Sequence, residues 1–208
     1  MNVKSLAGAA GAISRIMAEN RDYLVELDQQ NGDGDLGISM AAGFKALAEF
    51  LAAADEKDLG KLLMKSGSVL NEAAPSSLGT ILSIGLMGMA KSLKGKEEAG
   101  IAEIAAAMEA GLSSIMEKAK SKPGEKTILD ALCPAVGVLK NGDYADKTAI
   151  WAKAAQAAAA GSEGTKAMKS VHGRAAYYGE KSIGVLDGGS VVGKLIFEGI
   201  AGYACTKP

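Results

Sequence analysis

The sequence predicts an all-α fold, a barrel or bundle of about eight antiparallel amphipathic helices. Apolar residues recur every three or four positions along most of the 208 residues, which is the period of a helix with one buried face. No segment alternates apolar and polar residues over a sustained stretch, so no strand is predicted. Aromatic residues make up only 4% and glycines number 27, which suits close helix packing better than a strand-rich core.

The predicted helices follow one another through short connections, so most neighbours run antiparallel. The first spans residues 3–27, and Pro123-Gly124 and Asn141-Gly142-Asp143 are turn signals between later helices. No linker rich in Pro, Ser or charge interrupts the chain, so a single domain over residues 1–208 is predicted. The other helices are predicted at 38–53, 57–72, 77–93, 98–120, 125–139, 145–161 and 189–204, with a shorter one near 163–170.

Charge and cysteine content exclude several classes of function. The net charge is −1, and no basic run is long enough to follow a nucleic-acid backbone. Cys133 and Cys205 form neither a CxxC pair nor a disulfide framework, which favours a reducing compartment. Polar residues interrupt residues 1–17 every few positions, unlike a signal peptide or membrane helix. We expect a cytoplasmic protein that binds neither nucleic acid nor membrane.

Three aspartates, Asp28, Asp33 and Asp35, lie close together after the first predicted helix. Carboxylates so close repel one another unless a cation lies between them, and Mg²⁺ and Ca²⁺ prefer such oxygen ligands. The glycines of this loop allow the backbone to turn sharply enough for the three side chains to converge. The alternative is a solvated acidic turn in which Asp35 or Ser39 caps the next helix.

A calcium-binding EF-hand does not fit this loop. If Asn31 opened it, Leu36 would stand where EF-hands have glycine, and Ala42 where they have glutamate. Mg²⁺ takes few protein ligands and usually shares its shell with phosphates. Three carboxylates beside the start of a helix therefore indicate a bound nucleotide.

A second polar loop, residues 74–80, leads into an apolar helix. Its side chains Ser76, Ser77 and Thr80 can cap that helix. The start of a helix also offers free N–H groups and positive dipole character to a phosphate. Capping alone is sufficient reason for these residue types.

The third polar loop, residues 173–190, is rich in glycine. Arg174 carries a planar, permanently charged guanidinium that suits phosphate oxygens. The alternative is a surface connection with a structural salt bridge. His172 is the only histidine, and it has no nearby His, Cys or acidic cluster in the sequence that would make it a metal ligand.

Three segments in order, residues 27–40, 124–132 and 173–187, resemble the L-subunit (DhaL, DAK2 domain) family of dihydroxyacetone kinases. The resemblance covers nearly the whole chain. It implies a barrel of eight antiparallel helices with a nucleotide at one end. It also implies two Mg²⁺ ions that bridge the phosphates of ADP or ATP.

The resemblance implies roles for individual residues. Asp28, Asp33 and Asp35 would hold the Mg²⁺ ions, and Arg174 would act in catalysis at the phosphates. Further nucleotide contacts would come from Leu36, Gly37, Ile38, Ser39, Ser76, Ser77, Thr127, Asp187, Gly188 and Gly189, with Thr127 near the adenosine. Two positions depart from the family pattern: Leu36 stands where His or Thr is frequent, and Gly188-Gly189 where Pro-Gly is frequent.

The activity that the resemblance implies is phosphotransfer by a phosphoenolpyruvate-dependent dihydroxyacetone kinase, of which this chain would be the ADP-binding subunit. A separate K subunit would hold dihydroxyacetone or a related ketose. A phosphohistidine-carrying M subunit of the phosphotransferase system would rephosphorylate ADP. The alternatives are a ketose kinase subunit that exchanges free ATP, and an ADP-loaded regulatory module that acts on a transcription regulator.

Overall fold

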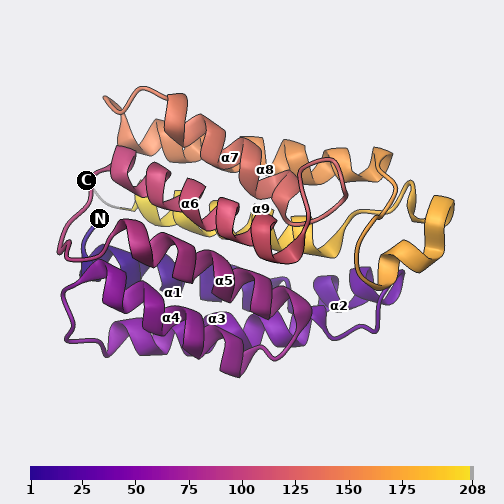
Figure 1. The fold of residues 1–208 in the computed structure, drawn as a ribbon, viewed down its shortest axis with the longest axis horizontal. Helices are drawn as coiled ribbons and strands as arrows, with labels where there is room; N and C mark the ends of the chain where they lie inside the picture. Colours follow the sequence, from indigo (N-terminus) through magenta and orange to yellow (C-terminus); the bar gives the residue numbers. More distant parts are fainter. Residues whose placement is uncertain (207–208) are drawn as a thin grey trace.

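The computed structural model describes residues 1–206, whose regular elements are all helices, with no strand among them (Figure 1). The all-α prediction is confirmed for this part of the chain. The helices are α1 (Val3–Glu19), α2 (Arg21–Gln29), α3 (Leu36–Ala52), α4 (Leu59–Ala73), α5 (Ser77–Ser92), α6 (Ile101–Ala119), α7 (Leu129–Asn141), α8 (Lys147–Gly164) and α9 (Gly188–Cys205), with 3-10 segments η1 (Thr165–Ala167) and η2 (Arg174–Ser182).

Eight long helices of the described chain form a closed ring. Each of α3 to α8 packs against the next helix along the chain, α9 packs against α8, and α1 closes the ring by contacting both α3 and α9. The long helices alternate in direction, so the connections fall into two sets at opposite ends of the barrel (Figure 1). The short helix α2 lies at one end, together with the α4–α5, α6–α7 and α8–α9 connections.

The predicted helix 3–27 is wrong, because the structure divides it into α1 and α2 at Asn20. The Asn20 backbone leaves helical geometry, with φ −99° and ψ 9°. Its backbone N–H and its side-chain amide both donate to the Ile16 carbonyl, at 3.1 and 2.8 Å. Asparagine favours such local side-chain bonds at the end of a helix. The break turns α2 across the end of the barrel, where it carries Asp28.

Three other predicted boundaries need correction. The helix predicted at 125–139 begins only at Leu129, because residues 124–128 form a turn with positive φ at Gly124 and Lys126. The short helix predicted near 163–170 consists of the end of α8 and the 3-10 segment η1. The segment predicted as a loop, residues 173–190, contains η2 and the start of α9.

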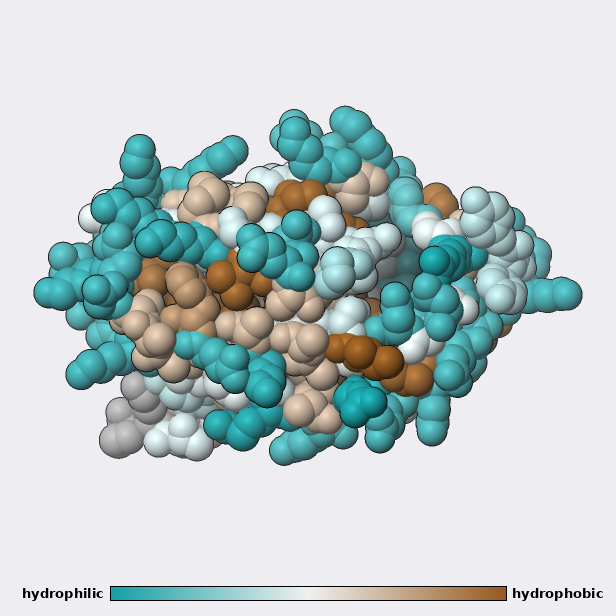
Figure 2. Space-filling view, turned by 90° about the horizontal axis from the view of Figure 1, so that it is seen from below, coloured by the Kyte–Doolittle hydropathy of each residue, from teal (hydrophilic) through white to brown (hydrophobic). Residues whose placement is uncertain are grey.

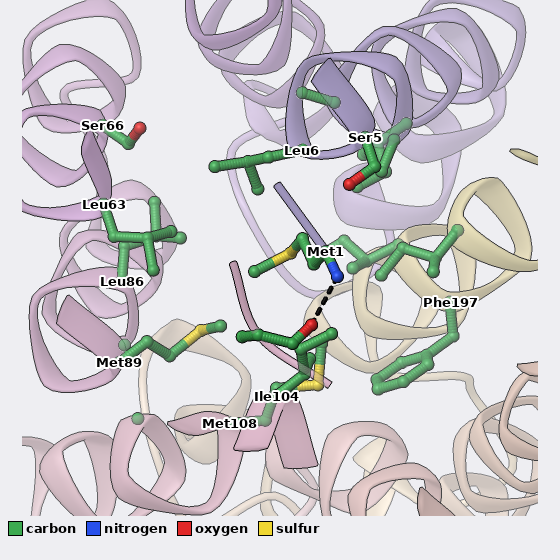
Figure 3. A pocket seen from close by; sticks show the side chains of 18 of the residues that line it. Met1, Ser5, Leu6, Leu63, Ser66, Leu86, Met89, Ile104, Met108 and Phe197 are labelled. Carbon is green, nitrogen blue, oxygen red and sulfur yellow. Dashed lines mark hydrogen bonds between the residues drawn. The ribbon is translucent and has the colours of Figure 1, made fainter. Parts of the chain in front are cut away.

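The barrel interior is apolar and encloses a cavity of about 840 Å³ (Figure 3). Among the residues that line it, the N-terminal ammonium of Met1 donates a hydrogen bond to the Ala99 carbonyl. Apolar side chains also reach the outer surface, in a band along the middle of the face shown in Figure 2. No helix of residues 1–206 has both the length and the apolarity to span a membrane. Side chains that line the cavity include Leu6, Leu63, Leu86, Met89, Met108 and Phe197.

Glycine lets α8 approach α7 closely, and this contact gives a stability test. A Cβ atom at Gly161 would lie 2.0 Å from the Asp130 carbonyl oxygen, so Gly161→Ala must push the helices apart. We expect the free energy of unfolding to fall by about 1–3 kcal/mol, as for other overpacked cores. Urea denaturation followed by circular dichroism measures this change.

The matched control is Gly137→Ala in α7, where an added Cβ meets no atom within 4 Å. Alanine is the better helix former, so this variant is expected to gain about 0.5–1 kcal/mol. Equal destabilisation of both variants would show that close packing at Gly161 is not the cause.

Candidate functional site

The three aspartates meet at the end of the barrel that carries α2. One carboxylate oxygen each from Asp28, Asp33 and Asp35 lies within 4.8 Å of the other two. Asp28 belongs to the last turn of α2, and Asp35 immediately precedes α3. Asp28 is half-buried, whereas Asp33 and Asp35 are exposed. Three negative charges are therefore held together beside solvent.

The loop folds around the Asp28 carboxylate. Its Oδ2 accepts a hydrogen bond from the Gly34 N–H at 2.8 Å, and Gly34 has φ +78°, a conformation that favours glycine. A Cβ at Gly32 would lie 2.3 Å from Asp28 Oδ1. Both glycines are thus required for the backbone to pass this close to the carboxylate.

The donor set fits Mg²⁺. An octahedral Mg²⁺ ion holds oxygen ligands at about 2.1 Å, so two ligands of one ion lie up to about 4.2 Å apart. The three carboxylates approach that spacing with all-oxygen donors and open solvent on one side. Water and phosphate oxygens can complete such a shell.

The start of α3 lies directly beside these carboxylates. Asp35 precedes the helix, but its side chain makes no capping hydrogen bond, so the capping role considered for it is wrong. The Ser39 hydroxyl donates to the Leu36 carbonyl and does not cap the helix either. The first N–H groups of α3 are therefore available to an anion.

Other candidate residues of this loop have packing roles. A Cβ at Gly37 would lie 2.0 Å from the Arg21 carbonyl oxygen, so Gly37 allows α3 to approach α2. Leu36 is buried, and Ile38 is 54% exposed at the end of the barrel. Gly37 therefore has a packing role, and Ile38 presents an exposed apolar side chain at this end of the barrel.

Arg174 reaches the aspartates from η2. Its guanidinium forms a salt bridge with the Asp33 carboxylate. The two residues lie far apart in the chain, and the connections that carry them, α2–α3 and α8–α9, both lie at the α2 end of the barrel (Figure 1). A cleft of about 470 Å³ opens beside Arg174, lined also by Asn31, Gly32, Tyr177 and Tyr178. The salt bridge considered from the sequence exists, and it lies within the site.

The start of α9 forms another side of this region. The Asp187 carboxylate caps α9 by accepting the Ser190 N–H at 2.6 Å. Burial raises the pKa of Asp187 to about 7, and the negative charges of Asp130 and Asp28 also raise it. The Ser190 N–H and the Lys126 ammonium lower this pKa in part.

The two positions that depart from the family pattern contact each other. A Cβ at Gly188 would lie 2.6 Å from Leu36 Cδ2, so the leucine side chain fills the space beside this glycine. At the neighbouring Gly189, a Cβ would lie 3.1 Å from Asp187 Oδ2. The start of α9 thus packs directly on the start of α3.

Two further loops border this end of the barrel (Figure 1). The Ser76 hydroxyl accepts the Gly79 N–H at 3.1 Å, so it caps α5 as considered from the sequence, and Ser77 is the exposed first residue of that helix. Thr127 lies in the α6–α7 connection, where its hydroxyl accepts the Leu129 N–H at 3.2 Å. These residues line the same end without forming part of the aspartate cluster.

Sequence reasoning missed the polar groups that hold the α6–α7 connection. Asp130 is 6% exposed and accepts the N–H groups of Gly124 and Thr127 at 2.6 and 2.7 Å. His172 Nε2 lies 2.6 Å from Glu125 Oε2, and this hydrogen bond lowers the pKa of Glu125. No local pattern could reveal the second contact, because its partners are 47 positions apart.

Comparison with known proteins identifies relatives of two lengths. The ADP-binding subunit DhaL of the PEP-dependent dihydroxyacetone kinase 1 of Listeria innocua is 32% identical over 181 residues, which are 86% of this chain and 85% of that protein. The corresponding subunit from Escherichia coli is 28% identical over 177 residues, 84% of each. The human triokinase/FMN cyclase is 31% identical over 182 residues, but these are only 31% of its length.

Solved structures show the same fold. The dihydroxyacetone kinase of C. freundii superposes with a TM-score of 0.75 at 24% identity, over 97% of this chain and 34% of that one. Its complex with AMP-PNP and Mg²⁺ gives a TM-score of 0.73 at 23% identity, over 94% of this chain and 33% of that one. Residues 30–202 match the profile of the DAK2 domain. The chain belongs to the DAK2 domain family.

Proposed function

We propose that this chain is the nucleotide-carrying subunit of a dihydroxyacetone-type kinase, with ADP or ATP bound through Mg²⁺ at the α2 end of the barrel. The observation that carries the proposal is the convergence of Asp28, Asp33 and Asp35, with Arg174 against them and the uncapped start of α3 beside them. The relatives that match along more than four fifths of their length are named as ADP-binding subunits, which supports this assignment.

In this proposal the three aspartates hold two Mg²⁺ ions. When bound, the ions would neutralise phosphate charge, which is most of what phosphoryl transfer requires from its catalyst. The free N–H groups at the start of α3 donate to phosphate oxygens, where the helix dipole also favours negative charge. The bound Mg²⁺ ions and nucleotide would thereby offset the mutual repulsion of the three carboxylates.

Arg174 is the proposed catalytic residue. It borders the cleft beside the aspartates, where its guanidinium can form a charge-assisted contact with a phosphate group. Its salt bridge with Asp33 places the guanidinium beside the aspartates. The remaining proposed nucleotide contacts are Leu36, Gly37, Ile38, Ser39, Ser76, Ser77, Thr127, Asp187, Gly188 and Gly189.

The phosphate acceptor is proposed to be dihydroxyacetone or a related ketose bound to a separate K subunit. In the family that this chain resembles, the separate K subunit holds the ketone through a histidine. The only histidine of this chain, His172, is hydrogen-bonded to Glu125. The names of the relatives indicate phosphoenolpyruvate as the source of phosphate. A phosphohistidine-carrying M subunit would therefore rephosphorylate ADP on this chain.

A reconstitution assay tests this function. Phosphoenolpyruvate, the general phosphotransferase proteins, the K and M subunits and this chain are mixed, and dihydroxyacetone phosphate is measured. We expect product only when every component is present, and ADP that stays with the chain through gel filtration. Turnover with free ATP and no M subunit would contradict the assigned phosphate donor. No product in any mixture would contradict a kinase.

Removal of one aspartate tests the metal assignment. We expect Asp33→Ala to weaken Mg²⁺-dependent ADP binding by about 30-fold or more, since loss of one partner of a close charged contact costs about 2–5 kcal/mol. Isothermal titration calorimetry with and without Mg²⁺ measures the affinity. Asp55→Ala, an exposed aspartate in the α3–α4 connection at the opposite end, is the control and should bind as wild type does. Retained affinity in Asp33→Ala would refute the assignment.

A second variant tests the shape of the loop without removing any charge. Gly32→Ala would place a Cβ 2.3 Å from Asp28 Oδ1, so the Asp28 carboxylate must move. We expect Mg²⁺-dependent ADP affinity to fall about tenfold, a loss of about 1.4 kcal/mol. Gly11→Ala in α1, where an added Cβ meets no atom within 4 Å, should leave affinity unchanged. Equal affinity of the two variants would show that the Asp28 position is unimportant.

A further inference from the structure

Lys126 is a buried cation to which the proposed function assigns no role. Its side chain is 4% exposed, and its Nζ lies 2.6 Å from the Ser182 carbonyl oxygen, 2.6 Å from that of Val185 and 3.2 Å from that of Met168. A lysine ammonium has three N–H donors, so these carbonyls satisfy all of them. Burial of a charge is costly unless it is bonded in this way. The Lys126 ammonium therefore has three defined partners, whereas the ammonium of a surface lysine is solvated by water.

The three carbonyls belong to the two ends of one segment. Met168 lies at its beginning, and Ser182 and Val185 lie at its end. The ammonium therefore joins the two ends of the segment 168–185, which is here called the cover segment. The Ser170 N–H, which donates to Ser182 Oγ at 2.9 Å, joins the same two ends. Arg174, which contacts Asp33, lies between these two ends.

The cover segment has little apolar burial of its own. Four of its large apolar side chains are exposed, whereas Val185 at its end is partly buried against the core. The exposed ones are Val171 (52%), Tyr177 (91%), Tyr178 (44%) and Ile183 (45%). Burial of apolar area usually holds a segment against the rest of a protein. Because this segment buries little apolar area, polar contacts must fix its position. Besides Lys126, the hydrogen bond from His172 to Glu125 joins it to the α6–α7 connection.

Lys126 is itself held in place by α7. Its backbone has φ +61°, an uncommon conformation for a residue other than glycine. The turn is stabilised by the buried Asp130 carboxylate, which accepts the N–H groups of Gly124 and Thr127. A continuous set of fixed contacts thus runs from α7 through Lys126 and the cover segment to Arg174.

We propose that Lys126 is a positioning residue that closes the base of the cover segment and so presents Arg174 to the aspartates and the nucleotide. The proposal rests on the proposed function, because it assumes that Arg174 contacts a bound nucleotide. Lys126 contacts neither the three aspartates nor the cleft beside Arg174. Its three hydrogen bonds all go to the cover segment, and its charge also acts on Asp187 just beyond that segment.

A double-mutant cycle tests whether Lys126 acts through Arg174. The affinity for ADP with Mg²⁺ is measured for wild type, Lys126→Met, Arg174→Met and the double variant. We expect Lys126→Met alone to weaken binding about tenfold, but to change it less than twofold when Arg174 is already absent. Additive losses would overturn the proposal, because Lys126 would then act independently of Arg174.

Hydrogen exchange provides a readout that does not depend on nucleotide. Amides of the cover segment should exchange at least tenfold faster in Lys126→Met, while amides of α4 and α5 keep the wild-type rate. Lys181→Met, an exposed lysine on the same segment, is the matched control and should keep both affinity and exchange unchanged. Unchanged exchange of the cover segment in Lys126→Met would overturn the proposal.

The two measurements separate this proposal from the proposed function. If wild type does not bind ADP with Mg²⁺, the proposed function fails, and hydrogen exchange still decides whether Lys126 holds the cover segment. If Lys126→Met does not fold, Lys126→Gln takes its place, since a neutral amide keeps two N–H donors. Its affinity loss should be smaller and again disappear without Arg174. No loss, or an additive one, would overturn the proposal.

Discussion

The contact between α9 and α1 closes the ring of helices, and the site depends on this closure. Small residues make the contact possible: a Cβ at Gly199 would lie 2.9 Å from the Ile13 Cα, and a Cβ at Gly8 2.3 Å from the Tyr203 ring. Because the long helices alternate in direction, closure brings α2, the α4–α5 and α6–α7 connections and the α8–α9 connection to one end (Figure 1). Residues distant in sequence therefore border a single region.

Electrostatics makes this end of the barrel different from an ordinary loop cluster. Three carboxylates repel one another. Within residues 1–206, the only cationic side chain that contacts them is Arg174, whose guanidinium pairs with Asp33. The start of α3 adds free N–H groups that no side chain caps. Divalent cations with a pyrophosphate group would satisfy both features at once, since the cations suit the carboxylates and the anion suits the helix start.

The contact between Leu36 and Gly188 places both departures from the family pattern at one point, where α9 begins against α3. A larger residue at position 188 would meet the leucine side chain, so the two positions must be considered together. This pair leaves the three aspartates and Arg174 in place. Leucine at position 36 offers no hydrogen-bonding group, whereas His or Thr at this position would.

The sequence by itself determined the all-α fold and the convergence of the aspartates. Helical periodicity is local, so it predicted most helices, and closely spaced aspartates with glycines between them predicted a compact acidic loop. Periodicity failed at Asn20 and at residues 124–128, where hydrogen bonds of the Asn20 and Asp130 side chains end or delay a helix that periodicity would continue.

Only the tertiary structure decided what holds Arg174 against Asp33. The carbonyl partners of the Lys126 ammonium lie 42, 56 and 59 positions further along the chain, and backbone carbonyls carry no residue-specific signal. A lysine in a turn is ordinary in sequence, and its burial follows from the way α7 and the cover segment pack together. Local patterns specify elements, whereas contacts between distant backbone atoms exist only once the ring of helices has closed.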